Sequence, residues 1–346
     1  MGKARSTGKV KVMLLRAMGA IIFAVVLIII AIAGLRWHNA SMYTVMGNIA
    51  AMGAEASYET NDGIRAIEGD YLKGFHFIPE RRTHPGTVVV YGGSEGSPAY
   101  DQAEAICAQG YEVIALYFWG QEGQASTLAN VPLEQFNEVE AYIEGSIDHP
   151  RPITVVGSSK GAEFSAELVA HGFAIDNLVN FAPADHSYFG LDYKNSEELP
   201  SFTYQGDPVP FVSQGNADAG ITALLLWDLA TGYPPSYRAC YETAAANADE
   251  NTLIDLSGFT GNALFFAGDE DAMWQSEVAA EGLAAQSERF EAHVYPGAGH
   301  AFSPDLEGLG SGWDIMLGGT SEAGAAAYKD STRILYERLA LWHGEL

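Results

Sequence analysis

Basic residues are scarce in this sequence, with 18 lysines and arginines against 44 aspartates and glutamates and a net charge of −26. This balance argues against nucleic acid as a partner, because phosphate binding requires a basic surface. Cysteine is rarer still, and Cys107 and Cys240 are too few for a disulfide scaffold or a cysteine-rich zinc site. We expect both to be small buried residues, with a disulfide as the alternative outside the cell.

Internal repeats and low-complexity tracts are also lacking. Hydrophobic residues make up 48% of the chain, enough for a sizeable core, which excludes intrinsic disorder of the whole protein. The length of 346 residues suits one large domain or two ordinary ones.

One long stretch without charge, AMGAIIFAVVLIIIAIAGL, occupies residues 17–35. A helix of this length crosses a hydrocarbon core of roughly 30 Å. The basic residues before it are Lys3, Arg5, Lys9, Lys11 and Arg16. The positive-inside rule then predicts a cytoplasmic leader over residues 1–16 and a single-pass signal-anchor that binds the lipid bilayer, with the remainder extracytoplasmic. A signal peptide cleaved after the A-x-A sequence at 31–33 is the alternative.

Residues 36–60 are mildly apolar and are expected to form a juxtamembrane stalk or a packing helix. In residues 61–346, apolar runs alternate with amphipathic patterns. Strands are expected at 74–79, 87–91, 112–117, 153–157, 178–181, 263–267 and 291–295, and helices at 100–109, 132–147, 160–171, 276–286 and 324–343. This order predicts a mostly parallel central sheet with helices on both faces.

One segment interrupts the alternation. Residues 184–258 lie between two expected strands and contain five prolines around helical pieces. Ligands of such sheets bind at the carboxyl ends of the strands. We therefore expect this segment to be a cap or lid over the site.

The sequence VVGSSKGAEF contains a G-x-S-x-G motif centred on Ser159, with a strand before it and a helix after it. This is the context of a nucleophile elbow, in which a tight turn exposes the serine above the sheet. A serine needs a base, and the partners follow in the order acid, then histidine. Asp271, after the strand ALFFAG, is expected to be the acid, and His300, in the loop AGHAF, the base.

Acyl transfer also requires hydrogen-bond donors for the oxyanion. We assign the backbone N–H of Lys160, which follows the nucleophile, and that of Ser94 in the loop GGSEG, with the adjacent Gly93 as the alternative. The side chain of Lys160 is expected to be solvated or locally paired with Glu163. Further candidates for the pocket lining are Gly93, His186 and Trp274.

Six segments carry a family resemblance: GGSEG (92–96), GSSKGAE (157–163), FAPADHSYFG (181–190), FTYQGDPVPF (202–211), GDEDAMWQS (268–276) and GAGHAF (297–302). Together they resemble the C-terminal domain of the acyl-CoA thioesterase and bile acid-CoA:amino acid N-acyltransferase family, an α/β-hydrolase branch. The resemblance implies an α/β-hydrolase fold, with Ser159, Asp271 and His300 as nucleophile, acid and base. It also implies hydrolysis, since the thioesterases of this family carry serine and its transferases cysteine.

The expected activity is therefore cleavage of a thioester or carboxylic ester through an acyl-enzyme, without cofactor or metal. Animal members carry a β-sandwich before the hydrolase, whereas here an apolar segment and a short stalk precede it. Because residues 1–35 contribute five of the positive charges and no negative one, the remainder carries −31, which disfavours polyanionic CoA. Two alternatives remain open. The protein is an acyltransferase with an amine as acceptor, or it is a membrane-tethered binding protein without activity.

Overall fold

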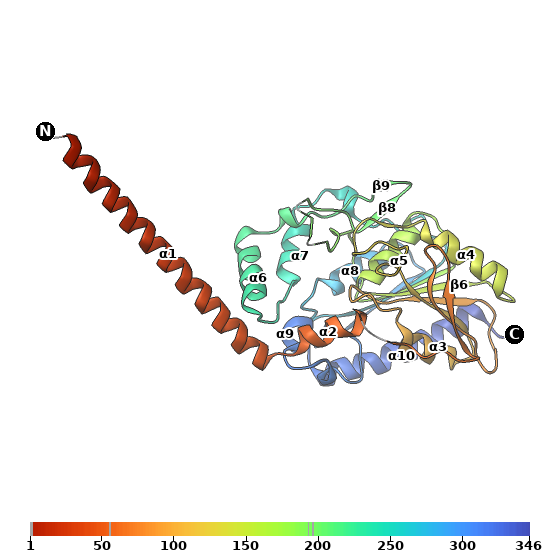
Figure 1. Cartoon of the computed structure of the whole chain (residues 1–346). Helices are drawn as coiled ribbons and strands as arrows, with labels where there is room; N and C mark the ends of the chain where they lie inside the picture. Colours follow the sequence, from red (N-terminus) through yellow and green to blue (C-terminus); the bar gives the residue numbers. More distant parts are fainter. Residues whose placement is uncertain (1–2, 55–56, 193, 196) are drawn as a thin grey trace.

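The computed structural model describes residues 3–54, 57–192, 194–195 and 197–346 (Figure 1). Its main sheet has eight strands in the order β1-β2-β4-β3-β6-β7-β10-β11. They are β1 (Ile64–Glu68), β2 (Lys73–Phe77), β3 (Thr87–Tyr91), β4 (Glu112–Tyr117), β6 (Ile153–Ser158), β7 (Asn177–Phe181), β10 (Asn262–Gly268) and β11 (Phe290–Tyr295). Two of its pairs, β1 with β2 and β2 with β4, are antiparallel and the other five are parallel, so the sheet is mostly parallel, as predicted.

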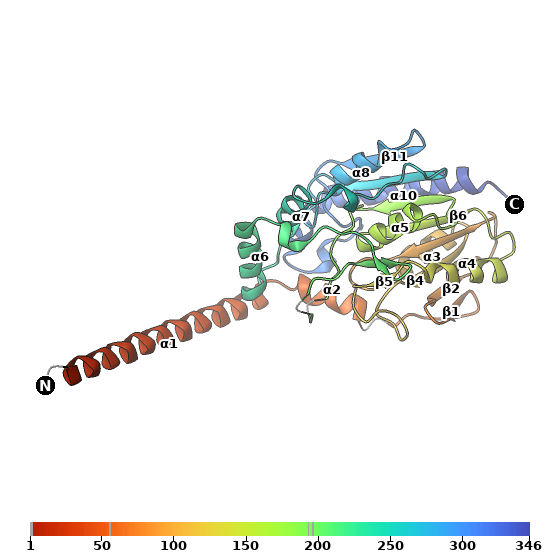
Figure 2. The same ribbon diagram turned by 90° about the horizontal axis from the view of Figure 1, so that it is seen from above.

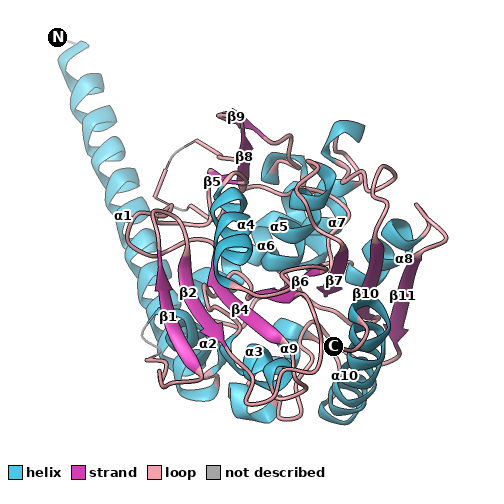
Figure 3. Cartoon of the chain, turned by 90° about the vertical axis from the view of Figure 1, so that its right-hand side faces the viewer, coloured by secondary structure: helices cyan, strands magenta, loops and turns pink. Residues whose placement is uncertain are grey.

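Helices cover both faces of this sheet (Figure 3). The α-helices in the described part of the chain are α1 (Lys3–Met42), α2 (Val45–Ala54), α3 (Tyr100–Cys107), α4 (Gln135–Ser146), α5 (Lys160–Ala170), α6 (Ala219–Thr231), α7 (Arg238–Ala245), α8 (Ser276–Ala284), α9 (Trp313–Leu317) and α10 (Ser321–His343). The expected strands and helices of the sheet region agree with these bounds to within three residues. Strand β1 was not expected.

Strand β3 shows how the sequence builds the two layers of the core. All five residues of TVVVY are buried, and their side chains alternate between the faces. Val89 and Tyr91 join the core under α4, α5 and α8, whereas Val88 and Val90 join the core under α3 and α10. A continuous apolar strand therefore indicates a sheet buried on both faces.

The N-terminal helix α1 projects away from the domain (Figures 1 and 2). Its segment Val12–Met42 is long and apolar enough to cross a membrane, and none of its most apolar window is buried. After α1 the chain packs onto the domain through α2. Val45 is fully buried beside Leu306, Trp313 and Leu317, so the start of α2 packs against the domain.

The segment 184–258 lies between β7 and β10 and contains α6, α7 and the short strands β8 (Phe202–Tyr204) and β9 (Asp207–Pro208). Strand β8 pairs with β9 and with β5 (Val131–Pro132) in a second, three-stranded sheet. Cys240 on α7 and Cys107 on α3 are both free.

Candidate active site

Ser159 lies in the sharp turn between β6 and α5, with φ 55° and ψ −121°. A positive φ is rare for a residue with a side chain, and it marks backbone strain. The turn requires glycine at its flanks. A Cβ atom at Gly157 would lie 2.2 Å from the Gly161 carbonyl oxygen, and one at Gly161 would lie 2.0 Å from that of Gly92. The geometry is that of a nucleophile elbow, which presents Oγ above the sheet.

His300 comes from the loop after β11 and lies between the predicted nucleophile and the predicted acid. Its Nε2 is 2.9 Å from Ser159 Oγ, and its Nδ1 is 2.8 Å from Asp271 Oδ2. The His300 backbone N–H donates to the Leu317 carbonyl oxygen at 2.8 Å, which fixes the loop. The structure thus brings together three residues that are far apart in the sequence.

Asp271 follows β10 and is 1% exposed. Its Oδ1 accepts the backbone N–H groups of Met273 (2.8 Å) and Trp274 (3.2 Å), and its Oδ2 accepts the Ser276 hydroxyl at 2.6 Å. These donors compensate the burial of the carboxylate and hold it facing the imidazole.

The two acids beside Asp271 lie differently. Asp269 and Glu270 are exposed, and Asp269 accepts the backbone N–H of Gly297 at 2.6 Å. Of the three acids in this loop, Asp271 is the one that meets the histidine.

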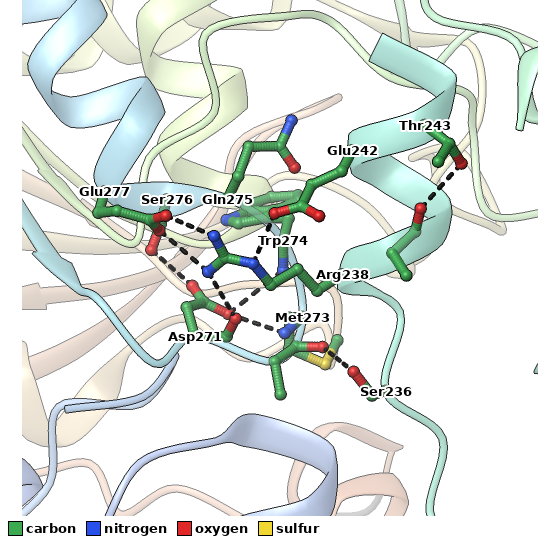
Figure 4. A network of polar contacts seen from close by, with 12 residues as sticks. Ser236, Arg238, Glu242, Thr243, Asp271, Met273, Trp274, Gln275, Ser276 and Glu277 are labelled. Carbon is green, nitrogen blue, oxygen red and sulfur yellow. Dashed lines mark hydrogen bonds and ion pairs between the residues drawn. The ribbon is translucent and has the colours of Figure 1, made fainter. Parts of the chain in front are cut away.

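Arg238, on α7, holds the loop that carries the acid (Figure 4). Its Nη1 donates to the backbone carbonyl oxygen of Asp271 at 3.0 Å. The same guanidinium pairs with Glu277 at the start of α8 and with Glu242 on α7. The hydrogen bond to Glu277, followed by that to Glu242, raises the pKa of Arg238. No motif marks this arginine, because two of its partners, Asp271 and Glu277, are more than 30 residues away in the sequence.

The predicted oxyanion donors lie on either side of Ser159. Lys160 is the first residue of α5, where backbone N–H groups have no acceptor within the helix. Ser94 and Gly93 both line the cavity at Ser159. Gly93 is packed against the nucleophile, since a Cβ on it would lie 3.2 Å from Ser159 Cβ. Its N–H donates to Glu95 Oε1 at 2.9 Å, so a carboxylate occupies this donor.

The side chains of Lys160 and Glu163 form a buried pair rather than a solvated one. Lys160 Nζ is 2.8 Å from Glu163 Oε2, and the side chains are 2% and 0% exposed. Lys160 also donates to Ser201 Oγ at 2.9 Å, while Glu163 accepts the Tyr188 N–H. Burial lowers the pKa of Lys160 and raises that of Glu163, each opposed by the partner's charge. The pair ties the elbow helix to segment 184–258.

A cavity of about 620 Å³ opens at the serine. Ser159, His300 and Glu95 line its polar end, and its apolar wall includes Ile49 of α2, Met316 of α9 and Leu335 of α10. Among the described residues, the lining includes no lysine or arginine and no member of segment 184–258. The expected lid therefore does not wall this cavity; α2, α10 and the loop before α9 do.

Of the three further pocket candidates, Gly93 lines the cavity. Trp274 lies behind the histidine instead, 4% exposed, with its ring edge-to-face at 5.6 Å from the His300 ring. His186 is apart from the cavity and pairs with Asp185 at 2.8 Å. Over residues 3–54, 57–192, 194–195 and 197–346, no group of three or more His, Cys, Asp or Glu side chains is placed to hold a metal ion.

Residues 131–306 match the family described as BAAT / Acyl-CoA thioester hydrolase C terminal. Acyl-coenzyme A thioesterase 1 of Rattus norvegicus is 23% identical over 306 residues, covering 82% of this chain and 67% of that protein. Bile acid-CoA:amino acid N-acyltransferase of Mus musculus is 25% identical over 254 residues, covering 69% and 54%. The solved esterase Pf2001 of Pyrococcus furiosus is 13% identical, with a TM-score of 0.47 over 84% of this chain and 97% of that one. This chain thus spans between about half and two thirds of the length of the two curated relatives.

Proposed function

This chain belongs to the BAAT / acyl-CoA thioester hydrolase C-terminal family, and from that premise we propose that it is a serine hydrolase that cleaves a thioester or a carboxylic ester. It is a thioesterase- or esterase-like α/β hydrolase. The observation that carries the proposal is the chain of hydrogen bonds from Ser159 through His300 to Asp271. The apolar wall of the cavity beside Ser159 suits an acyl chain.

In the proposed mechanism, His300 Nε2 takes the proton of Ser159 as Oγ attacks the substrate carbonyl carbon. Asp271 accepts from Nδ1–H, which orients the ring and stabilises the imidazolium. The backbone N–H of Lys160 and one from the Gly93–Ser94 segment hold the oxyanion. His300 then protonates the leaving group, and water attacks the acyl-enzyme in a second step that releases the acid.

Glu95 adds a condition to this mechanism. Its carboxylate accepts both the Gly93 N–H and, at 2.6 Å, the Ser97 hydroxyl. If Gly93 is the second oxyanion donor, the Glu95 side chain has to leave that N–H when the substrate carbonyl enters. Ser94, the donor assigned from the sequence, carries no such condition.

The test is replacement of the nucleophile in the full chain, purified in detergent. We expect Ser159→Ala to abolish hydrolysis of a short p-nitrophenyl ester and labelling by a fluorophosphonate probe, with the fold intact by circular dichroism. Ser257→Ala is the matched control, because Ser257 is an exposed serine outside the cavity. Turnover retained by Ser159→Ala would refute the assignment. A wild-type chain that neither turns over nor labels would favour the non-catalytic binding protein.

Acyl transfer to an amine is the second candidate, because one relative is a bile acid-CoA:amino acid N-acyltransferase. The same acyl-enzyme would then react with an amine instead of water. Mass spectrometry of the products formed with an added amino acid separates the two reactions. We expect the free acid, since the nucleophile here is a serine.

We further propose that residues 17–35 anchor the chain, with the N-terminus cytoplasmic and the catalytic domain outside. The support is the apolar run within α1 and the five basic residues that precede it. Protease added to intact cells should then digest the catalytic domain. A protected domain would contradict this orientation.

A further inference from the structure

Helix α6 carries most of its large apolar side chains on the outside of the molecule, while Leu225 is buried. Its sequence is AGITALLLWDLAT. Leu224 is 67% exposed, Leu226 59% and Trp227 50%, and Leu229 is also exposed. Exposed apolar groups that are contiguous mark an interaction site, because each would gain free energy by leaving water.

The polar side chains of α6 face the domain instead. Thr231 is 2% exposed and donates to the Trp227 carbonyl oxygen at 2.9 Å. Thr222 lies beside the thiol of Cys240 on α7. The side chains that α6 exposes are thus apolar, whereas a surface helix in water turns a polar face outward. An apolar outer face indicates an apolar medium on that side of the helix, as for a helix that lies in a membrane interface.

Asp228, the one charged residue of α6, follows the same pattern. Its carboxylate lies near Tyr233, whose phenol also contacts Tyr43 at a ring distance of 5.3 Å. Burial first, and then Tyr43 and Asp228, raise the pKa of Tyr233. The acid therefore faces the junction between α1 and the domain.

Hydrogen bonds join helix α6 to the end of the candidate membrane span. Arg36, the first charged residue after the apolar run 17–35, donates to the Leu229 and Ala230 carbonyl oxygens at 3.4 and 3.3 Å. Asn39 Nδ2 donates to the Thr231 carbonyl oxygen at 3.1 Å. Figures 1 and 2 both show α6 beside the domain-proximal end of α1. The exposed face of α6 thus lies where α1 leaves the hydrocarbon.

We propose that α6 is a second membrane contact, which inserts Leu224, Leu226 and Trp227 into the lipid bilayer next to the anchor. Tryptophan prefers the membrane–water interface. A helix that lies there buries its apolar side chains at the boundary of headgroups and acyl chains. The inference rests on the proposed anchoring of the chain by α1, and it is independent of the proposed chemistry. It assigns part of segment 184–258 to membrane contact.

The test places an environment-sensitive fluorophore at single cysteines of the full chain in phosphatidylcholine vesicles. The background is Cys107→Ser with Cys240→Ser, and the labelled positions are Leu226→Cys on α6, Ile29→Cys in α1 and Leu341→Cys near the end of α10. Leu341 is the matched control, since it is a leucine at 72% exposure near the end of α10. Figure 1 shows the C-terminus that follows α10 on the side of the domain opposite to α6. Far-UV circular dichroism verifies that each variant is folded.

We expect labels at positions 29 and 226 to emit at short wavelength and to be quenched by nitroxide lipids, while the label at 341 behaves as in water. Quenching at 29 without quenching at 226 would overturn the proposal for α6 and leave the anchor standing. Absence of quenching at 29 would overturn both. Neither result depends on the identity of the substrate, so the failure of the catalytic proposal stays distinguishable.

Discussion

Asp271 is a single residue on which four hydrogen bonds converge, two from backbone N–H groups, one from the Ser276 hydroxyl and one from His300. Asp271→Asn preserves the shape and the backbone contacts. Its amide group, however, would donate to His300 Nδ1 and leave the proton on Nε2, where the ring can no longer accept from Ser159. We expect kcat to fall by about 10³- to 10⁴-fold with the fold intact. Steady-state kinetics of ester hydrolysis by wild type and Asp271→Asn measure this change in kcat.

Asp269→Asn is the control for that experiment. Asp269 is an exposed acid two residues away, and its contact is the N–H of Gly297 rather than the histidine. We expect little change in kcat. A comparable loss in both variants would mean that the acid was assigned to the wrong residue.

His343, the last residue of α10, is held in the neutral state by burial. The Pro85 carbonyl oxygen can only accept, so Nδ1 carries the proton, and Nε2 accepts the Thr154 hydroxyl; both distances are 2.8 Å. Burial, the largest cause, lowers the pKa of His343 to about 4. Between this pKa and the ordinary value of about 6.5, the unfolded chain binds a proton that the folded chain does not. The stabilising effect is therefore lost as the pH falls through that window.

We predict that wild type loses about 2 kcal/mol more free energy of unfolding than His343→Gln between pH 7 and pH 5. Glutamine does not titrate, so the difference isolates this group from the other histidines and the carboxylates. Urea unfolding of the full chain in detergent, followed by tryptophan fluorescence, gives both values. Equal losses in the two proteins would contradict the assignment.

At this scale local order in the sequence was enough to predict which residues would meet. Ser159 lies in a motif flanked by a strand and a helix, and Asp271 and His300 each follow a strand, so their meeting could be predicted. The contacts of Arg238 and Glu95 could not. Those depend on how segment 184–258 docks and on side-chain rotamers in a loop, for which sequence periodicity carries no information.

At the scale of elements, α7 connects segment 184–258 to the acid loop through Arg238. We predict that Arg238→Met lowers kcat by about 10- to 100-fold with little change in KM, because small displacements of a catalytic group are costly and Arg238 does not line the cavity. Arg238→Lys should restore less than full activity, since an ammonium cannot reproduce the fork to Glu277 and the Asp271 carbonyl oxygen. Ester hydrolysis over a substrate series separates kcat from KM.

Arg333→Met is the matched control. Arg333 also pairs with two carboxylates, Asp330 and Glu337, but on the exposed face of α10. Exposed pairs contribute little, so we expect unchanged kcat and KM. Unchanged kinetics in both variants would mean that Arg238 does not position the acid.

Element types and order were predictable because apolar runs and amphipathic periods report burial directly. Strand β1 was not predicted, since IRAIE is exposed at three of its five positions and pairs at the sheet edge. The absence of segment 184–258 from the described lining of the cavity was also not predicted. A prediction from topology places this segment near the strand ends, but the cavity is walled by Ile49 of α2 and by α10, which lie at opposite ends of the chain. Such contacts appear only once the chain is folded.

At the scale of the whole molecule, charge is divided between the leader and the domain. Residues 1–35 carry only positive charge and the remainder −31. The cavity repeats this imbalance locally, since Glu95 and Asp101 line it and the described lining holds no lysine or arginine. Both the long-range field and the local lining therefore oppose a polyanionic leaving group, although relatives bear acyl-coenzyme A in their names.

This division predicts which thioester is cleaved faster. For one acyl group, we expect kcat/KM for the CoA thioester to lie below that for the uncharged N-acetylcysteamine thioester at low salt. The difference between the two kcat/KM values should decrease with added salt, because the screening length falls from about 30 Å at 0.01 M to about 8 Å at 0.15 M. Glu95→Gln combined with Asp101→Asn should decrease this difference further. Taking the ratio of the two substrates cancels any effect of these variants on oxyanion stabilisation. If the CoA thioester were preferred and its kcat/KM fell with added salt, a basic binding site for CoA would be required instead. The negative charge of the domain would then lie away from the path of the substrate.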